Sequence, residues 1–332
     1  MPHGQEILAQ IRQFMASRTL LSACELDLFT VLDRNPASSS QLAGELNLDQ
    51  RGLTRVLDTL VTLDYLAKDP SGLYRPTDTG RLLSADHQQS VLPMARHLAH
   101  VRDNWHYLTE TVRRGENPHH QHVTDLDPDE QEAFIGAMHV VGQELSQDIA
   151  AEYDASFAHC LLDIGGGSGI YTIAFLRANP GLRAVIFDLD RVIPFSRKFV
   201  RSYGLEDRVT FVPGDFYEKE LPTGCDLALL SAIIHQNSQE ENRELLTKIF
   251  KALEPGGRVL IRDHIMDETR TKPAAGAMFA LNMLVNTRGG DTYTLSEISE
   301  DLKQSGFSQI RDLRSGQDSF ERMDCLVEAR KE

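Results

Sequence analysis

One histidine, His235, follows the apolar segment DLALLSAII at residues 226–234, where a polar segment begins. An imidazole has an ordinary pKa of about 6.5 and can take a proton from a reacting group near neutral pH. Asp263 ends the next apolar segment, RVLIRD, and its carboxylate could hold the second ring nitrogen of the histidine. The pair predicts a general base, His235, that Asp263 orients. The alternative is a histidine with a loop or packing role.

A glycine-rich stretch, LLDIGGGSGIYT at residues 161–172, joins an apolar run to a helical pattern. Such a junction presents backbone amides to a bound ligand at short range. The dinucleotide pattern G-x-G-x-x-G fails, because Ile170 stands in place of its third glycine. Asp163, Gly165, Gly167 and Gly169 instead fit D-x-G-x-G-x-G, which is typical of S-adenosylmethionine (SAM) binding. We therefore expect SAM, a cationic ligand without phosphate, as the cofactor.

Two later apolar runs also end in side chains that suit an adenosine. Asp188 ends AVIFD, 25 residues after Asp163, a position from which a carboxylate can accept both ribose hydroxyls. Asp215 and Phe216 end VTFVPGDF and could bond the adenine amino group and pack on its ring. The alternative is that the glycines only form turns and that the two carboxylates only cap helices.

Near-continuous apolar runs alternate with helical patterns from residue 156 onward. This alternation is typical of a parallel sheet that helices cover on both faces. The runs SQIRDLRS and DCLVEARK near the C-terminus predict an antiparallel hairpin at the sheet edge. We predict an α/β fold, a Rossmann-like and mostly parallel seven-stranded sheet, with ligands outside the carboxyl ends of the strands.

The first part of the chain is helical in pattern. Apolar residues recur at helical spacing over residues 5–32, and two further helices and a hairpin that turns at residues 69–72 follow. This is the order of a winged helix-turn-helix. We predict an all-α winged-helix domain over residues 1–110, connecting helices over residues 111–155 and the α/β domain over residues 156–332.

These motifs resemble those of the metal-independent small-molecule O-methyltransferases of the caffeic-acid and acetylserotonin type, which have many bacterial members. The resemblance covers nearly the whole chain, through WHYLTETVRRGENP, DIGGGSG, FDLDRVI, GDF, IIH, LEPGGRVLIRD and ISEDLKQSGF. It implies a homodimer formed by the winged-helix domain and an in-line transfer of methyl from SAM to a hydroxyl of a small aromatic molecule. The SAM contacts that it implies are Gly165, Asp188, Asp215, Phe216 and, near the adenosine, Ser231.

The family's substrate pocket is lined by the connecting helices and by the segment after the fifth strand. By resemblance, the candidates for contact with the acceptor are Trp105, Phe134, Met138, Phe279, Asn282, Met283 and Asn286. The apolar members of this set would suit the core of any fold equally well.

The chain departs from the family's pattern in two places. Gln236 and Asn237 follow the histidine where relatives often carry an aspartate and an aromatic residue. Thr292, beside Asp291, stands where a second orienting glutamate is common. The histidine and the strand-end aspartate keep the family's separation of 28 residues. An alternative is therefore a SAM-binding relative that acts on carbon or nitrogen, or that catalyses a reaction without methyl transfer.

The composition restricts the partners. A formal charge of -15, from 49 acidic and 34 basic residues, opposes binding to nucleic acid and to anionic membranes. A winged-helix DNA-binding regulator is the alternative from another class, but the presumed recognition helix carries aspartates among its arginines and offers no basic footprint.

The cysteines and histidines outside these motifs predict neither a disulfide framework nor a metal site. No C-x-x-C pair occurs among the four cysteines, which are Cys24, Cys160, Cys225 and Cys325. HHQH at residues 119–122 lies in a proline-flanked polar loop, which we interpret as solvated. No leader pattern and no run of about 18 apolar residues occurs, so we expect a protein of the reducing cytoplasm.

Overall fold

The computed structural model describes residues 4–119, 128–314 and 323–332, and the chain divides into two compact units. The first unit comprises residues 1–103 and 127–140, and the second comprises residues 104–126 and 141–332. This division does not test the domain boundaries predicted at residues 110 and 155, which stay predictions. Among the described residues, no helix is long and apolar enough to cross a lipid bilayer.

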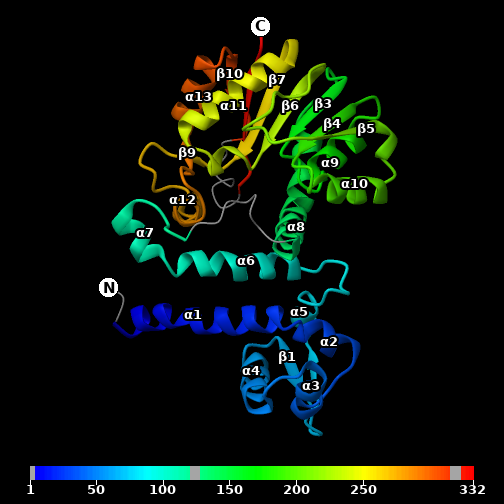
Figure 1. The fold of residues 1–332 in the computed structure, drawn as a ribbon, viewed down its shortest axis with the longest axis vertical. Helices are drawn as coiled ribbons and strands as arrows, with labels where there is room; N and C mark the ends of the chain where they lie inside the picture. Colours follow the sequence, from blue (N-terminus) through cyan, green and yellow to red (C-terminus); the bar gives the residue numbers. More distant parts are fainter. Residues whose placement is uncertain (1–3, 120–127, 315–322) are drawn as a thin grey trace. The chain divides into compact units, whose positions relative to one another are not determined.

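Residues 4–103 of the first unit form helices and a small hairpin, drawn in blue to cyan in Figure 1. Its elements are α1 (Gly4–Glu25), α2 (Leu28–Arg34), α3 (Ser39–Leu46), α4 (Gln50–Thr62), β1 (Leu66–Lys68), β2 (Tyr74–Pro76), α5 (Asp78–Arg81) and α6 (Leu92–Trp105), whose last two residues belong to the second unit. Ser38 and Asp49 cap α3 and α4 by accepting bonds from backbone amides of the first turn. The predicted hairpin is confirmed: β1 and β2 pair antiparallel, with Ala67 opposite Arg75.

The second unit is built on a seven-stranded sheet with the order β10-β11-β7-β6-β3-β4-β5. The strands are β3 (Cys160–Ile164), β4 (Arg183–Asp188), β5 (Val209–Pro213), β6 (Cys225–Ser231), β7 (Leu253–Asp263), β10 (Ser308–Asp312) and β11 (Cys325–Arg330). The five strands from β3 to β7 pair in parallel, and β11 pairs antiparallel with both β7 and β10. The predicted α/β fold and its C-terminal antiparallel strands are therefore confirmed.

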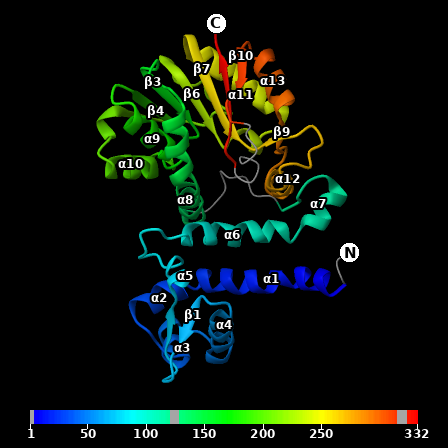
Figure 2. The same ribbon diagram turned by 180° about the vertical axis from the view of Figure 1, so that it is seen from behind.

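Helices cover both faces of this sheet (Figures 1 and 2). On one face α11 (Gln239–Ala252) and α13 (Leu295–Gln304) pack against alternate strand residues such as Leu162 and Leu230. On the other face α9 (Ile170–Ala178) and α10 (Ile193–Ser202) pack against the intervening residues, such as Leu161 and Leu229. Since side chains of a strand alternate between the faces, a strand covered on both sides is apolar throughout.

Shorter elements complete the second unit. They are α7 (Leu108–Arg114), the turn η3 (Ile234–Gln236), β8 (Ile265–Met266), α12 (Ala274–Asn286) and β9 (Tyr293–Thr294), and α8 (Pro128–Glu152) enters the unit with its last residues. β8 follows β7 after one residue and pairs in parallel with β9, so the chain leaves the sheet and forms α12 beside the strand ends.

The expectation that the cysteines form no disulfide is wrong for one pair. A disulfide joins Cys160 and Cys225, which are 65 residues apart in the sequence, while Cys24 and Cys325 are buried and take no part in a disulfide. Spacing along the chain did not reveal the pair, because the pairing of β3 with β6 brings the first residues of these strands together.

Candidate active site

His235 lies in the turn η3, directly after β6. The strand ends at Ser231, three residues before the end of the apolar segment, because Ala232 adopts a left-handed φ of 58° and turns the chain away from the sheet. Left-handed backbone is uncommon for a residue with a side chain. The amide of Ala232 still donates to the carbonyl of Arg262 at 2.8 Å, so the turn stays tied to β7.

The predicted pairing of His235 with Asp263 is present. Nδ1 of the imidazole lies 2.9 Å from both carboxylate oxygens, and the side chain of Asp263 is 1% exposed. One of these oxygens also accepts the backbone N–H of His264 at 2.8 Å. The imidazole ring therefore has a fixed orientation, with Nδ1 toward the carboxylate and Nε2 away from it.

The protonation of this pair follows from its charges. Burial alone would raise the pKa of Asp263, but the charge and the hydrogen bond of His235, together with the charge of Arg262 and the amide of His264, bring it below the ordinary value. An ionised carboxylate accepts hydrogen bonds only, so Nδ1 carries a proton. In the neutral imidazole Nε2 then holds a lone pair and is the basic nitrogen.

A buried polar network fixes the turn that carries His235. The side chain of Asn242, near the start of α11, donates to the carbonyl of Ile234 at 2.9 Å and accepts from Asn237 Nδ2 at 3.0 Å. The hydroxyls of Tyr217 and Tyr293 donate to the side chain and the backbone of Asn237. Asn237 is fully buried, so this departure from the family's pattern supports the turn.

The glycines of residues 165–169 form a tight loop between β3 and α9. Gly165, Gly167 and Gly169 all have left-handed φ angles, between 56° and 75°. A Cβ on Gly165 would lie 2.6 Å from the side chain of Ile233, whereas a Cβ on Gly167 would meet nothing within 4 Å. Gly167 therefore faces open space at the carboxyl end of the sheet, and its position can admit a ligand.

Asp163 and Asp188 are brought together beside this loop. Asp163 accepts a bond from the hydroxyl of Thr172 at 2.6 Å, and Asp188 accepts the amides of Gly167 and Leu189, each at 2.7 Å. Burial raises the pKa of both carboxyl groups to about 6. The two amide bonds of Asp188 partly oppose this shift, since they favour the ionised form.

The remaining predicted cofactor residues lie on the neighbouring strand ends. Asp215 follows β5 and accepts the amide of Tyr217 at 2.8 Å, and the ring of Phe216 lies 3.7 Å from the Cβ position of Gly165. Ser231 ends β6, and its hydroxyl accepts a bond from Arg262 Nε at 2.9 Å. The structure thus brings Asp215 and Phe216 to the glycine loop, while Ser231 is engaged by Arg262.

Most of the predicted acceptor-binding residues lie on α12. The ring of Phe279 meets His235 edge to face, with 4.8 Å between ring centroids. Asn282 accepts Trp105 Nε1 at 2.8 Å, and Asn286 donates back to the same oxygen at 3.0 Å. The remaining members of the set are the buried Met283 in the second unit and the half-buried Phe134 and Met138 in the first unit.

The residues in place of the family's second glutamate point elsewhere. Thr292 is buried and its hydroxyl donates to the carbonyl of Gly276, at 3.4 Å. Asp291 forms an ion pair with Arg270 at 3.2 Å on the surface. Neither side chain forms a hydrogen bond with His235, so in the part of the chain that the structure describes Asp263 alone orients the imidazole.

Two family models match the chain, one in each part of it. Residues 8–86 match an O-methyltransferase dimerisation domain, and residues 105–308 match an O-methyltransferase domain. The second match covers more than half of the chain and includes the glycine loop, the strand ends and His235.

The chain belongs to the O-methyltransferase family. It is 33% identical to the tetracenomycin polyketide synthesis 8-O-methyl transferase TcmO of Streptomyces glaucescens, over 92% of each chain. It is 29% identical to the acetylserotonin O-methyltransferase of Gallus gallus, over 95% of each chain. The solved structure of PigF with SAH superposes with a TM-score of 0.88, at 26% identity, over 99% of this chain and 100% of the other.

This O-methyltransferase uses SAM as its methyl donor, and its own residues fit that cofactor. The ring of Phe216, the open position of Gly167 and the carboxylates of Asp188 and Asp163 meet at the carboxyl ends of β3 to β5. Carboxylates favour a ligand with positive charge. The absence of phosphate from SAM explains why basic side chains are not needed at the loop.

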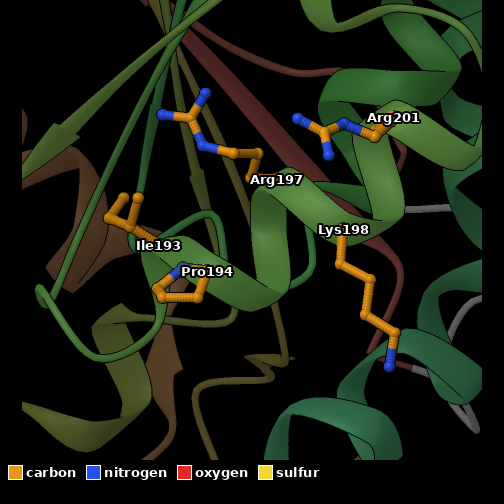
Figure 3. A pocket seen from close by; sticks show the side chains of 5 residues that line it. All are labelled: Ile193, Pro194, Arg197, Lys198 and Arg201. Atoms are coloured by element: carbon orange, nitrogen blue, oxygen red, sulfur yellow. The ribbon is translucent and has the colours of Figure 1, made fainter.

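Other features of the O-methyltransferase lie outside this site. A surface pocket of about 360 Å³ is formed by five residues of α10 (Figure 3), namely Ile193, Pro194, Arg197, Lys198 and Arg201, and none of the predicted site residues lines it. Within residues 4–119, 128–314 and 323–332, no group of three His, Cys, Asp or Glu residues could hold a metal ion. His120 and His122 of the predicted solvated loop lie outside the described residues.

Sequence reasoning missed two groups that the structure adds to the site. His264 directly follows Asp263 and packs on Phe279, with 5.1 Å between ring centroids. Asn242 holds the turn of His235 from the first turns of α11. His264 lies at the same strand end, so the reasoning that identified Asp263 could also have identified His264. Asn242 is a single asparagine within a helical pattern, which gave no signal.

Proposed function

We propose that this enzyme transfers the methyl group to a hydroxyl of a small aromatic molecule, with His235 as the general base. The observation that carries the proposal is the buried pair of His235 and Asp263, in which the ionised carboxylate directs the lone pair of Nε2 away from itself. A base of this kind, fixed at a strand end beside an aromatic ring, suits an aromatic hydroxyl.

The reaction follows from the charges involved. When bound, SAM supplies an electrophilic methyl group on a positively charged sulfur. A phenol has a pKa of about 10 and is a poor nucleophile until its proton leaves, so Nε2 takes this proton while the oxygen attacks the methyl carbon. SAM, held by Asp188, Asp215 and Phe216, would supply the methyl group, and its sulfur would keep the electron pair of the carbon–sulfur bond. Much of the remaining barrier is met by holding the three reacting atoms in line.

The side chains around the glycine loop divide the binding of the cofactor among them. Asp188 has two carboxylate oxygens with free lone pairs beside their backbone bonds, so it can accept the ribose hydroxyls. Asp215 and Phe216 serve the adenine, and Asp163 adds negative charge for the cationic ligand. These assignments are supported by the convergence of the side chains at the carboxyl ends of β3, β4 and β5.

The acceptor is best placed beside Phe279, because this ring already contacts the imidazole of His235. Trp105 and Asn282 continue the same surface through their mutual hydrogen bond. An aromatic acceptor can pack on these rings while its hydroxyl reaches Nε2.

One experiment tests the acceptor class directly. The pure protein is incubated with methyl-labelled SAM and a library of phenols, flavonoids, quinols and indoles, and labelled products are identified by mass spectrometry. The proposal predicts label on the oxygen of an aromatic hydroxyl. Label on carbon or nitrogen, or tight binding of SAM without any transfer, would contradict it.

We further propose that the functional state is a homodimer formed through α1. Five large apolar side chains of its first four turns, Ile7, Leu8, Ile11, Phe14 and Met15, are each about half exposed or more. Contiguous apolar surface of this kind is rare on monomeric proteins and marks an interface. The match of residues 8–86 to a dimerisation domain supports a second copy of the chain as the partner.

A further inference from the structure

His264 is a second imidazole at the site, to which the proposed reaction gives no role. It directly follows Asp263 at the end of β7 and is 7% exposed. Its ring packs on Phe279 with 5.1 Å between centroids, and the ring of His235 meets the same phenyl ring at 4.8 Å. The two imidazoles therefore flank one aromatic side chain beside the acceptor's proposed place.

The hydrogen bonds of His264 are incomplete. Nδ1 is buried and has no partner, and in the described part of the chain no side-chain hydrogen bond of this residue is found. Buried polar atoms are almost always paired, so the unpaired Nδ1 indicates that the fold itself does not complete the hydrogen bonding of His264. Nδ1 is sealed from solvent and cannot reach a ligand, so Nε2 is the nitrogen that can meet one.

The protonation state of His264 follows from its surroundings. Burial lowers the pKa to about 4, and the charges of His235 and Arg262 act in the same direction, while Asp263 opposes them. The ring is therefore neutral near pH 7 and carries one proton. A buried N–H without a partner is rarer than an acceptor without one, which places this proton on Nε2 and the lone pair on Nδ1.

We propose that His264 determines acceptor specificity: Nε2–H donates a hydrogen bond to an oxygen of the acceptor that lies beside the hydroxyl deprotonated by His235. The inference rests on the proposed function. The two imidazoles then have opposite roles, since His235 presents a lone pair and His264 presents a proton. The acceptor class is a hydroxylated aromatic ring with a ketone, quinone or ether oxygen next to the reacting hydroxyl.

A neutral donor suits this place for an electrostatic reason. SAM carries a positive charge on its sulfur, and a charged imidazolium or ammonium in the acceptor pocket would repel it. A neutral N–H group recognises an oxygen without that cost. A site that donates a hydrogen bond also binds an analogue without the oxygen more weakly, because the N–H group of the site is then left unpaired.

The first test determines by NMR which nitrogen of His264 carries the proton. It uses the full-length protein, loaded with S-adenosylhomocysteine and labelled with ¹⁵N-histidine. The proposal predicts a neutral ring with the proton on Nε2 from pH 5.5 to pH 8. It also predicts that 2-acetyl-1-naphthol shifts this N–H resonance more than 2-isopropyl-1-naphthol, whose substituent has a similar size but no ketone oxygen. A proton on Nδ1, a charged ring or equal shifts would overturn the inference.

The second test measures the affinity of the same two probes by calorimetry. His264→Phe should weaken binding of the ketone by at least about 10-fold and change binding of the isopropyl compound by less than about 2-fold. His264→Gln keeps a donor at the position of Nε2 and should retain the ketone within about 3-fold. Equal losses for both probes would show a structural role only, and lack of ketone preference in the wild type would refute the acceptor class.

These binding tests do not require turnover. A protein that prefers the ketone through His264 but transfers no label to any hydroxyl contradicts the proposed reaction while leaving the recognition by His264 in place. Conversely, methyl transfer that is indifferent to the neighbouring oxygen overturns the role of His264 alone.

Discussion

Two carboxyl groups of the site, those of Asp263 and Asp188, differ in pKa because their partners differ. Asp263 faces the imidazole of His235, and its pKa lies below the ordinary value despite complete burial. Asp188 has two backbone amides and the more distant charge of Arg191, which offset its burial only in part, and its pKa is raised to about 6. The first carboxylate therefore stays ionised at every pH of interest, whereas the second titrates just below neutrality.

The raised pKa of Asp188 predicts that the affinity for SAM falls at acid pH. At pH 7.5 the carboxylate is mostly ionised and accepts hydrogen bonds, and at pH 5 it is mostly protonated and loses acceptor capacity. Titration calorimetry with S-adenosylhomocysteine from pH 5 to pH 8 should show affinity rising by about 10-fold through a step near pH 6. Asp163, with a pKa of about 6, adds to the same step.

Substitution of Asp188 tests its own contribution to cofactor binding. Asp188→Asn should weaken binding at pH 7.5 by roughly 10-fold and reduce the step, since it removes the charged acceptor for the ribose hydroxyls. Asp190→Asn, an exposed aspartate in the same turn, is the matched control and should leave both unchanged. Affinity that is flat between pH 5 and pH 8 would refute the assignment.

At the scale of elements, the site depends on the segment that joins β6 to α11. The backbone reverses at Ala232, the turn η3 carries His235, and the capping box of Ser238 and Glu241 starts α11. Asn242 closes this segment, because its side chain bonds both the carbonyl of Ile234 and the amide of Asn237. The position of the base is therefore set by buried polar groups outside the reaction itself.

From this network we predict that Asn242→Ala displaces His235, although the substitution leaves the histidine itself unchanged. The change leaves a buried carbonyl and a buried amide without partners, at a cost of roughly 1–3 kcal/mol in the free energy of unfolding. It should also lower kcat by about 10-fold, since a small displacement of a catalytic group is costly, while the affinity for SAM stays unchanged. Chemical denaturation and steady-state kinetics measure both effects.

The control for this experiment is Glu244→Ala, which removes an exposed side chain two residues further along α11. It should leave stability and kcat near the wild-type values. If Asn242→Ala destabilised the protein but kept full kcat at a temperature where it is folded, the network would have no role in positioning His235.

At the scale of the whole molecule, the two parts of the chain differ in what they leave exposed. The second unit encloses its sheet between helices on both faces. The first unit has its own core around Phe29, Leu57 and Tyr74 but leaves the apolar side of α1 uncovered. A chain that buries one set of apolar residues and exposes another at helical spacing requires a partner for the second set.

A charge among the exposed apolar side chains of α1 should dissociate the proposed dimer. Phe14→Glu places a carboxylate where the partner's apolar side chains would pack, and we expect dissociation to become at least about 100-fold easier. Gln13→Glu adds the same charge on the opposite side of α1, given 100° per residue, and should leave the dimer intact. Sedimentation velocity at micromolar concentration distinguishes the two, and a wild-type monomer would refute the proposal.

The sequence predicted those parts of the structure that follow from local patterns. Alternation of apolar runs and helices predicted the sheet, and the strand ends predicted the pairing of His235 with Asp263. It did not predict the disulfide of Cys160 with Cys225, which depends on which strands become neighbours. It also did not predict the supports of the turn, because hydrogen bonds between distant side chains leave no period in the sequence.

The most direct test of the central claim is His235→Ala, measured in two ways on the same preparation. Single-turnover methyl transfer to an accepted phenol should fall by at least about 100-fold, because the phenol keeps its proton. The affinity for S-adenosylhomocysteine should stay within about 2-fold of the wild-type value, since the carboxylates proposed to hold the cofactor, Asp163, Asp188 and Asp215, lie at or after the ends of β3, β4 and β5. Transfer at the wild-type rate, or an equal loss of cofactor binding, would contradict the assignment of His235 as the base.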